Sequence, residues 1–128
     1  MSYYFSTQLH TTFQEAIART TAALQAEGFG VLTEIDLKAT LKKKLDVDFY
    51  NYIILGACHA PFAYQALQVE DKIGTMLPCN VIVQERESGI IEVSAVDPMA
   101  SMSSVENESL GAVAHDVRDK LKCVIHSL

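Results

Sequence analysis

The segments Pro78-Cys79-Asn80-Val81-Ile82-Val83-Gln84-Glu85 and Ile90-Ile91-Glu92-Val93-Ser94-Ala95-Val96 decide the fold. Apolar and polar side chains alternate along both segments, which is the pattern of a half-buried strand. The four residues 86–89 join the segments and end in glycine, a connection that is typical of a β-hairpin. One apolar face then forms across the pair from Val81, Val83, Ile91, Val93 and Ala95. We therefore expect an antiparallel pair of strands here.

Three earlier stretches also have the composition of strands. Aromatic and β-branched residues are enriched in residues 3–9, 31–35 and 49–57, as is typical of strands. The last stretch is nearly continuous in apolar and aromatic residues, which favours a strand that is at least partly covered on both faces. Together with the hairpin, these stretches predict a mainly antiparallel sheet of about five strands.

The first helix has clear signals at both ends. Thr12 opens a capping box, and apolar residues then recur at helical spacing as far as Leu24. Gly28 suits the left-handed position that follows a helix, and Phe29 is placed to fold back on Leu24 as in a Schellman motif. The sequence therefore predicts a helix that ends at Glu27.

Three further helical segments follow. Asp36 is a good N-cap for a helix with a stripe of leucines at positions 37, 41 and 45. Pro61 suits the first position of a short helix that is apolar most of the way round. After a predicted loop over residues 99–104, Ser103 and Glu106 offer a capping box for a final helix. The apolar stripe of that helix consists of Leu110, Val113, Ala114, Val117, Leu121, Val124, Ile125 and Leu128.

The order of these segments predicts an α+β fold. Two long helices are expected to cover one face of the antiparallel sheet, with short helices in the connections. The 128 residues are enough for one hydrophobic core and too few for two ordinary domains. We therefore expect a single domain over residues 1–128.

The composition bounds the environment and the partners. The chain is 49% apolar and 20% charged, as in ordinary soluble domains, with a net charge of -6 and a pI near 5.1. Nucleic acid is not expected as a partner, because phosphates are neutralised by a basic surface. The N-terminus lacks the features of a signal peptide, and no apolar run reaches the roughly 18 residues that span a bilayer. We expect a cytoplasmic protein with no membrane partner.

Two of the three cysteines lie in stretches that bracket the short helix, at residues 56–61 and 77–80. Cys58 closes the third strand and Cys79 opens the fourth, so antiparallel pairing of these strands brings both thiols to the same end of the sheet. The alternation of side chains along a strand argues in part against a shared site for the two thiols. Cys79 shares a face with Val81, whereas Cys58 falls on the opposite face unless Gly56 breaks the alternation.

These stretches carry a resemblance to a known family. The residues 55–58 (Leu-Gly-Ala-Cys), 62–63 (Phe-Ala), 66–67 (Ala-Leu), 77–81 (Leu-Pro-Cys-Asn-Val) and 97–98 (Asp-Pro) occur in the order and spacing of the family called domain of unknown function 302 (DUF302). The resemblance implies an α+β fold with a sheet-and-helix arrangement similar to that of the TATA-binding protein. It also implies a homodimer and no established activity.

The chain departs from the family pattern directly after the first cysteine. His59 and Ala60 stand where the family typically has Asn and Pro. His59 is then either an additional ligand or a neutral surface replacement.

The candidate site is a pocket bounded by residues 58–62 and 76–80. Its predicted ligand-binding residues are Cys58, His59, Phe62, Met76, Cys79 and Asn80. Three interpretations of the cysteines stay open. They are small buried side chains, or ligands of a soft metal ion together with His59, or reactive thiols.

Two kinds of function follow from these interpretations. The first is a non-enzymatic homodimeric domain that binds a small ligand or a soft metal ion, since the site has no accompanying set of acid and base residues. The alternative is a thiol-redox or sulfur-transfer protein, in which Cys58 or Cys79 reacts and the other thiol resolves the intermediate. Whether the protein is an enzyme is left open, and no organic cofactor is predicted, because phosphate-loop and dinucleotide-binding motifs are missing from the sequence.

Overall fold

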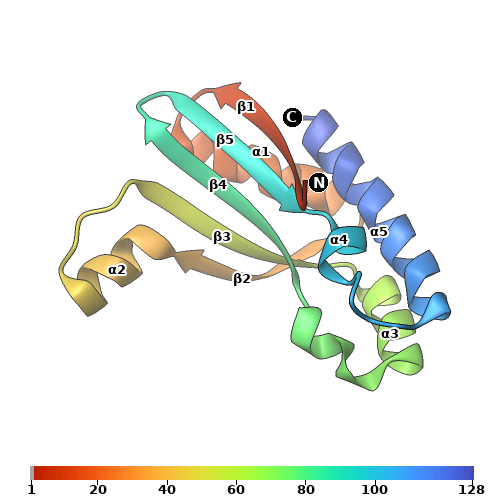
Figure 1. The fold of residues 1–128 in the computed structure, drawn as a ribbon. Coiled ribbons are helices and arrows are strands. Elements are labelled where there is room, and N and C mark those ends of the chain that lie inside the picture. Colours follow the sequence, from red (N-terminus) through yellow and green to blue (C-terminus); the bar gives the residue numbers. More distant parts are fainter. Residues whose placement is uncertain (1) are drawn as a thin grey trace.

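The computed structural model describes residues 2–128, and its centre is a five-stranded antiparallel sheet (Figure 1). The strands are β1 (Tyr4–His10), β2 (Gly30–Asp36), β3 (Asn51–Cys58), β4 (Cys79–Glu87) and β5 (Ile90–Val96). Their order across the sheet is β1-β5-β4-β3-β2, so the hairpin β4–β5 lies at the centre. This confirms the predicted α+β fold and antiparallel sheet.

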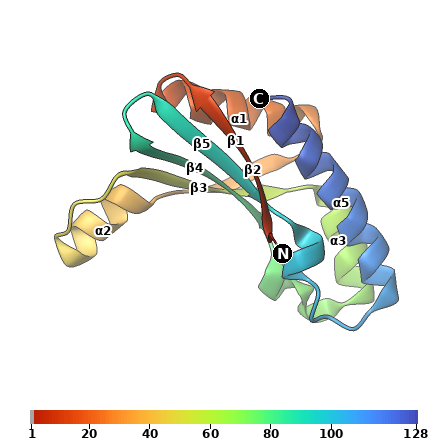
Figure 2. The ribbon, with the colours of Figure 1, turned by 45° about the horizontal axis from the view of Figure 1, so that its top comes forward.

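Two long helices cover one face of the sheet, as predicted (Figure 2). They are α1 (Phe13–Ala26), which contacts β2, β4 and β5, and α5 (Glu108–His126), which contacts β1 and β5. The connections contain the short elements α2 (Leu37–Leu45), α3 (Ala60–Val69), the 3-10 helix η1 (Asp71–Met76) and α4 (Pro98–Ser101). Every helix among residues 2–128 is too short or too polar to cross a bilayer.

The predicted ends of α1 are confirmed in atomic detail. The hydroxyl oxygen of Thr12 accepts a hydrogen bond from the backbone N–H of Glu15 at 3.1 Å. Gly28 has a left-handed φ of 89°, and the N–H of Phe29 donates to the carbonyl of Leu24 at 2.9 Å. This is the Schellman arrangement, which also buries Phe29 against the core.

The segment between β5 and α5 differs from the prediction. Residues 98–101 form the short helix α4 instead of a loop, because the Asp97 side chain accepts from the N–H of Met99 at 2.9 Å and proline suits a first helical position. The capping box at Ser103 was wrong. The long helix begins after Asn107, whose side-chain oxygen accepts from two backbone N–H groups and outcompetes the earlier serine.

The core fills the space between the sheet and the two long helices. Every second residue of the central strands is buried there, including Leu55, Val81 and Val93. A smaller cluster of Ala66, Ile73 and Leu110 lies under α3, η1 and the start of α5. The two clusters meet at the end of the sheet where β3 stops and β4 begins.

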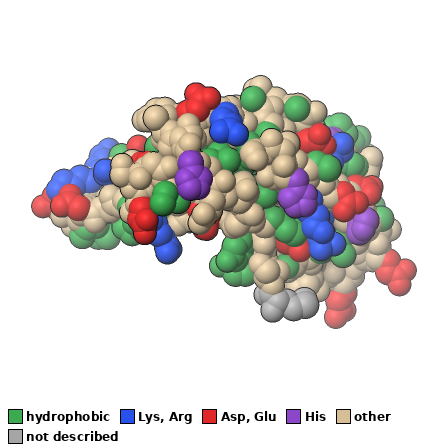
Figure 3. Space-filling model, turned by 90° about the horizontal axis from the view of Figure 1, so that it is seen from above, with side chains coloured by type: hydrophobic (Ala, Val, Ile, Leu, Met, Phe, Trp, Pro, Cys, Tyr) green, Lys and Arg blue, Asp and Glu red, His purple; other side chains and the backbone are tan. Residues whose placement is uncertain are grey.

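The helix α2 and the adjoining ends of β2 and β3 form a projecting arm (Figures 1 and 2). None of the α2 residues is buried. Lysine side chains on this end lie beside apolar ones (Figure 3), and the last turn of the helix contains Lys42, Lys43 and Lys44. Large apolar side chains are exposed along the arm, among them Ile35 at 45% and Leu45 at 65%.

Candidate functional site

The two cysteine-bearing stretches meet at one end of the sheet. Ala57 pairs with Cys79 and Gly56 pairs with Asn80 in the β3–β4 ladder. This confirms that strand pairing brings Cys58, the next residue of β3, to the same end as Cys79. Cys79 lies on the core side and is 8% exposed, whereas Cys58 is half-buried.

Gly56 is required by the close approach of its neighbours. A Cβ atom at this position would meet the side chain of Thr33 on β2 and would lie 2.9 Å from Cγ of Pro78. Pro78 therefore lies directly over β3, and the residue that follows it begins β4. The glycine and the proline thus fix how the two cysteine stretches pack together.

A small apolar cavity of about 30 Å³ lies between this end of the sheet and the helices α3, α4 and α5. Its lining includes Cys58, His59, Phe62, Pro78, Cys79 and Pro98. A volume of this size holds one or two water-sized molecules. Apart from the imidazole, its lining side chains are apolar groups and thiols, so a small apolar group fits it better than a solvated ion.

His59 forms one wall of this cavity. Its ring stacks on Phe62 with the ring centroids 4.4 Å apart, and it meets the edge of Phe29 at 5.3 Å. Gly28 leaves room for the imidazole, because a Cβ atom there would lie 2.8 Å from Nε2 of His59. The imidazole is therefore held among two aromatic rings and a glycine.

The buried Nδ1 atom of His59 has no hydrogen-bond partner among residues 2–128. Burial lowers the pKa of His59, and the nearby charge of Lys120 lowers it further. The imidazole is consequently neutral at pH 7, with one nitrogen that donates and one that accepts. His59 thus contributes an unsatisfied hydrogen-bonding atom beside an apolar cavity.

The cysteines differ in exposure and in chemistry. Burial, together with the proximity of Cys58, raises the pKa of Cys79 to about 11. The Cys79 thiol is therefore protonated at neutral pH, which disfavours it as an attacking thiolate. Cys58, Cys79 and Cys123 are all free thiols, and Cys123 is exposed on α5.

The predicted metal site receives no geometric support. Among residues 2–128, no group of three or more histidine, cysteine, aspartate or glutamate side chains is placed to hold a metal ion. The assignment of Cys58, His59 and Cys79 as metal ligands thus stays a prediction.

Two of the six predicted ligand-binding residues lie apart from the cavity. Met76 ends η1 and is 38% exposed. Asn80 alternates with Cys79 along β4, so it lies on the other face of the sheet, where it lines a separate groove. The structure therefore brings together Cys58, His59 and Phe62 with Cys79.

Sequence reasoning missed the wall that α4 and α5 contribute. Pro98, Leu110 and Val117 line the cavity from these helices. Pro98 belongs to the Asp-Pro pair of the family pattern, which was a usable signal. The apolar stripe of α5 gave no such signal, because core packing alone accounts for it.

The fold and the site define a class: an α+β domain with one helix-covered sheet face and a small apolar cavity at the sheet end. Residues 5–128 match the family described as domain of unknown function DUF302. The chain belongs to this family.

A solved structure supports the same assignment. The chain is similar to the crystal structure of the uncharacterized conserved protein DUF302 from Bacillus stearothermophilus, with a TM-score of 0.90 and 25% sequence identity. The similarity covers 98% of this chain and 98% of that one. A comparison with curated proteins finds no match.

Proposed function

We propose that this protein is a non-enzymatic binding domain that takes up a small, mainly apolar ligand at the cavity beside His59. The proposal rests on the meeting of distant segments around one cavity. Segments that are far apart in the chain and that carry the family pattern, residues 57–58, 62–63, 77–79 and 98, all line this one cavity. Core packing alone does not need these segments to meet around empty space.

The lining defines the chemistry of the ligand. The apolar side chains that line the cavity favour a mainly apolar ligand, because burial of apolar surface contributes about 25 cal/mol per Å². The unpartnered Nδ1 of His59 favours a ligand with one hydrogen-bonding group, since a buried unpaired polar atom costs about 1–3 kcal/mol. A small alcohol or thiol has both properties.

Entry requires the wall to move. The cavity is far smaller than the roughly 300–1,000 Å³ of ordinary ligand pockets. His59 and Phe62 stack on each other at the surface side, and neither is fully buried. Rotation of these two rings would enlarge the cavity without a change in the sheet.

The experiment is a titration of the ¹⁵N-labelled protein with 1-butanol and, separately, with pressurised xenon as a purely apolar probe. We expect saturable shifts of the amides of Cys58 and Cys79 with both probes. Ala66→Leu fills the cavity from α3 and should abolish the shifts, whereas Ala39→Leu on the exposed side of α2 should leave them unchanged. Shifts that persist in folded Ala66→Leu, or that do not saturate, would overturn the proposal.

We also propose that two chains associate through the projecting arm. The chain exposes 7492 Å², whereas a folded monomer of this mass typically exposes about 6,700 Å². The excess is close to the roughly 800 Å² that each partner contributes to a standard interface. The arm offers exposed apolar side chains at Ile35, Leu45 and Val47, and it continues along the outer edge of β2, which pairs with β3 alone and exposes Leu32.

A further inference from the structure

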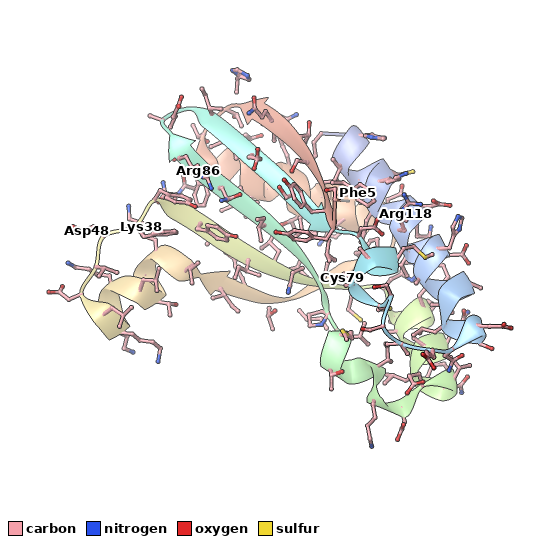
Figure 4. All side chains as sticks on the ribbon, viewed as in Figure 1. Phe5, Lys38, Asp48, Cys79, Arg86 and Arg118 are labelled. Atoms are coloured by element: carbon pink, nitrogen blue, oxygen red, sulfur yellow. The ribbon has the colours of Figure 1, made fainter. Side chains whose placement is uncertain are left out.

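The open face of the sheet, opposite the long helices, carries a groove that the cavity site does not use. Its volume is about 460 Å³, within the range of small-molecule sites. The side chains that matter for recognition are Tyr3, Tyr4, Tyr52, Asn80, Arg86 and Glu92. Arg86 and Cys79 lie at opposite ends of β4 (Figure 4). Asn80 lines the groove and directly follows Cys79, so it is the sheet itself that separates the groove on its open face from the cavity on its core side.

The floor of the groove is formed by side chains of the central strands, Ile82, Gln84 and Ser94, and tyrosine rings lie along its sides. Ser6 faces Ser94 across the β1–β5 pair, with the two hydroxyl oxygens 2.6 Å apart. Tyr4 lies at the β1 side and Tyr52 at the β3 side. Burial and the neighbouring Tyr50 and Tyr3 raise the pKa of Tyr52.

One end of the groove holds two opposite charges. The guanidinium of Arg86 lies 5.5 Å from the ring centroid of Tyr50, and the proximity of Tyr50 and the charge of Glu92 raise the pKa of Arg86. Among residues 2–128, neither Arg86 nor Glu92 has an ion-pair partner within 4 Å. A cation and an anion are therefore both available beside aromatic walls.

We propose that this groove binds a small zwitterion that carries an aromatic ring, the chemical class of an aromatic amino acid. The guanidinium of Arg86 receives the ligand carboxylate, because its planar donors match a carboxylate in a paired geometry. The carboxylate of Glu92 receives the ammonium group. The ring lies over Ser94 and Ile82 beside the tyrosine rings that line the groove, where offset or edge contacts between aromatic rings are favourable.

A ligand with only one charge fits less well. A simple anion bound at Arg86 leaves Glu92 unpaired and brings two negative charges close together. A simple cation bound at Glu92 leaves Arg86 unpaired and brings two positive charges close together. An uncharged aromatic molecule contacts the tyrosine rings but gains no ion pair with Arg86 or Glu92. The zwitterion satisfies both charges, so discrimination among these ligands is the signature of the site.

The test compares three probes by isothermal titration calorimetry and amide shifts: L-phenylalanine, phenylacetate without the ammonium group, and phenethylamine without the carboxylate. We expect L-phenylalanine to bind about tenfold more tightly than either single-charge probe, the effect of one charge-assisted hydrogen bond. Arg86→Gln should remove this advantage over phenethylamine, and Glu92→Gln should remove the advantage over phenylacetate. Arg19→Gln on α1 and Glu34→Gln on β2 are matched exposed controls that should change nothing.

Three results would overturn the proposal. The first is equal affinity for all three probes, and the second is no saturable binding at millimolar concentrations. The third is that Arg86→Gln and Glu92→Gln alter the sedimentation of the protein rather than probe affinity, which would show that a second copy covers this face. Ala66→Leu should leave phenylalanine binding intact, so the outcome is independent of the cavity proposal.

Discussion

Nε of Arg118 on α5 lies 3.4 Å from Oδ2 of Asp97, the residue that follows β5. Asp97 is 8% exposed, and its other carboxylate oxygen caps α4. Its N–H donates to the carbonyl of Tyr3 at 2.7 Å. The side chain of Asp97 therefore joins the short helix to the long helix, and its backbone N–H joins both to the sheet edge. This explains in structural terms why an Asp-Pro pair stands here, with Pro98 at the cavity wall.

Asp97→Ala should destabilise the protein by about 2 kcal/mol, because it removes a helix cap and leaves the guanidinium of Arg118 without its partner. Asp97→Asn keeps an oxygen that can cap α4 and removes only the charge, so it should cost less than half as much. Urea unfolding followed by circular dichroism measures both values. Equal losses of stability in Asp97→Ala and Asp97→Asn would show that the cap contributes nothing beyond the ion pair.

Gly28→Ala should destabilise the protein by more than 1 kcal/mol, because the left-handed conformation disfavours a Cβ atom and that atom would press on His59. Removal of the imidazole in Gly28→Ala/His59→Ala should recover part of this loss in a double-mutant cycle. Gly111→Ala is the matched control. It lies within α5 with open space around it and should stabilise the protein slightly.

Cys79 should be unreactive in the folded protein. At pH 8, iodoacetamide should modify the exposed Cys123 quickly and Cys79 slowly, because the pKa of Cys79 is about 11 and its side chain is buried. Mass spectrometry of peptides gives the two rates, and denatured protein serves as the control. Equal rates in the folded protein would instead support the thiol-based alternative.

The same raised pKa predicts a dependence of stability on pH. Cys79 binds its proton more tightly in the folded state than at its ordinary pKa of 9.0. Its contribution is fully present below pH 9 and is lost as the pH rises towards 11. The stability difference between wild type and Cys79→Ala should therefore fall by about 2–3 kcal/mol across this window. A constant difference would show that Cys79 is not the group responsible.

Leu45→Glu should convert the proposed dimer to a monomer, because it places a charge in the exposed apolar surface of the arm. Analytical ultracentrifugation at several protein concentrations gives the mass. Leu67→Glu on α3 is the control, since Leu67 is also exposed, at 43%, but lies outside the arm. A wild-type chain that sediments as a monomer would refute the assembly, and dissociation by Leu67→Glu alone would place it on α3.

The fold followed from local patterns to a large extent. Alternation in the β4–β5 segments predicted the hairpin, and Thr12 and Gly28 predicted both ends of α1. These signals act over a few residues, so they can be read without the rest of the chain. The start of α5 was harder to predict, because two residues that can cap a helix, Ser103 and Asn107, lie within five positions, and in the structure the Asn107 side chain forms the cap.

Part of the candidate site was also predictable. Antiparallel pairing of β3 with β4 placed Cys58 and Cys79 at the same end of the sheet. The same alternation rule puts Asn80 on the opposite face from Cys79, a signal that was present in the sequence and was not applied. The partnership of His59 with Gly28 and Phe29 had no local signal, because a turn after α1 and the end of β3 come together only in the folded chain.

The sequence by itself determined the strands, most helix ends and the antiparallel hairpin, because turn chemistry and side-chain periodicity act between near neighbours. Only the tertiary structure decided the order β1-β5-β4-β3-β2 and the cavity behind His59. It also gathered Tyr4, Tyr52 and Arg86 on one open face. The physical reason is that strand hydrogen bonds and core packing join segments of distant sequence, and their free energy depends on the whole arrangement rather than on any one stretch.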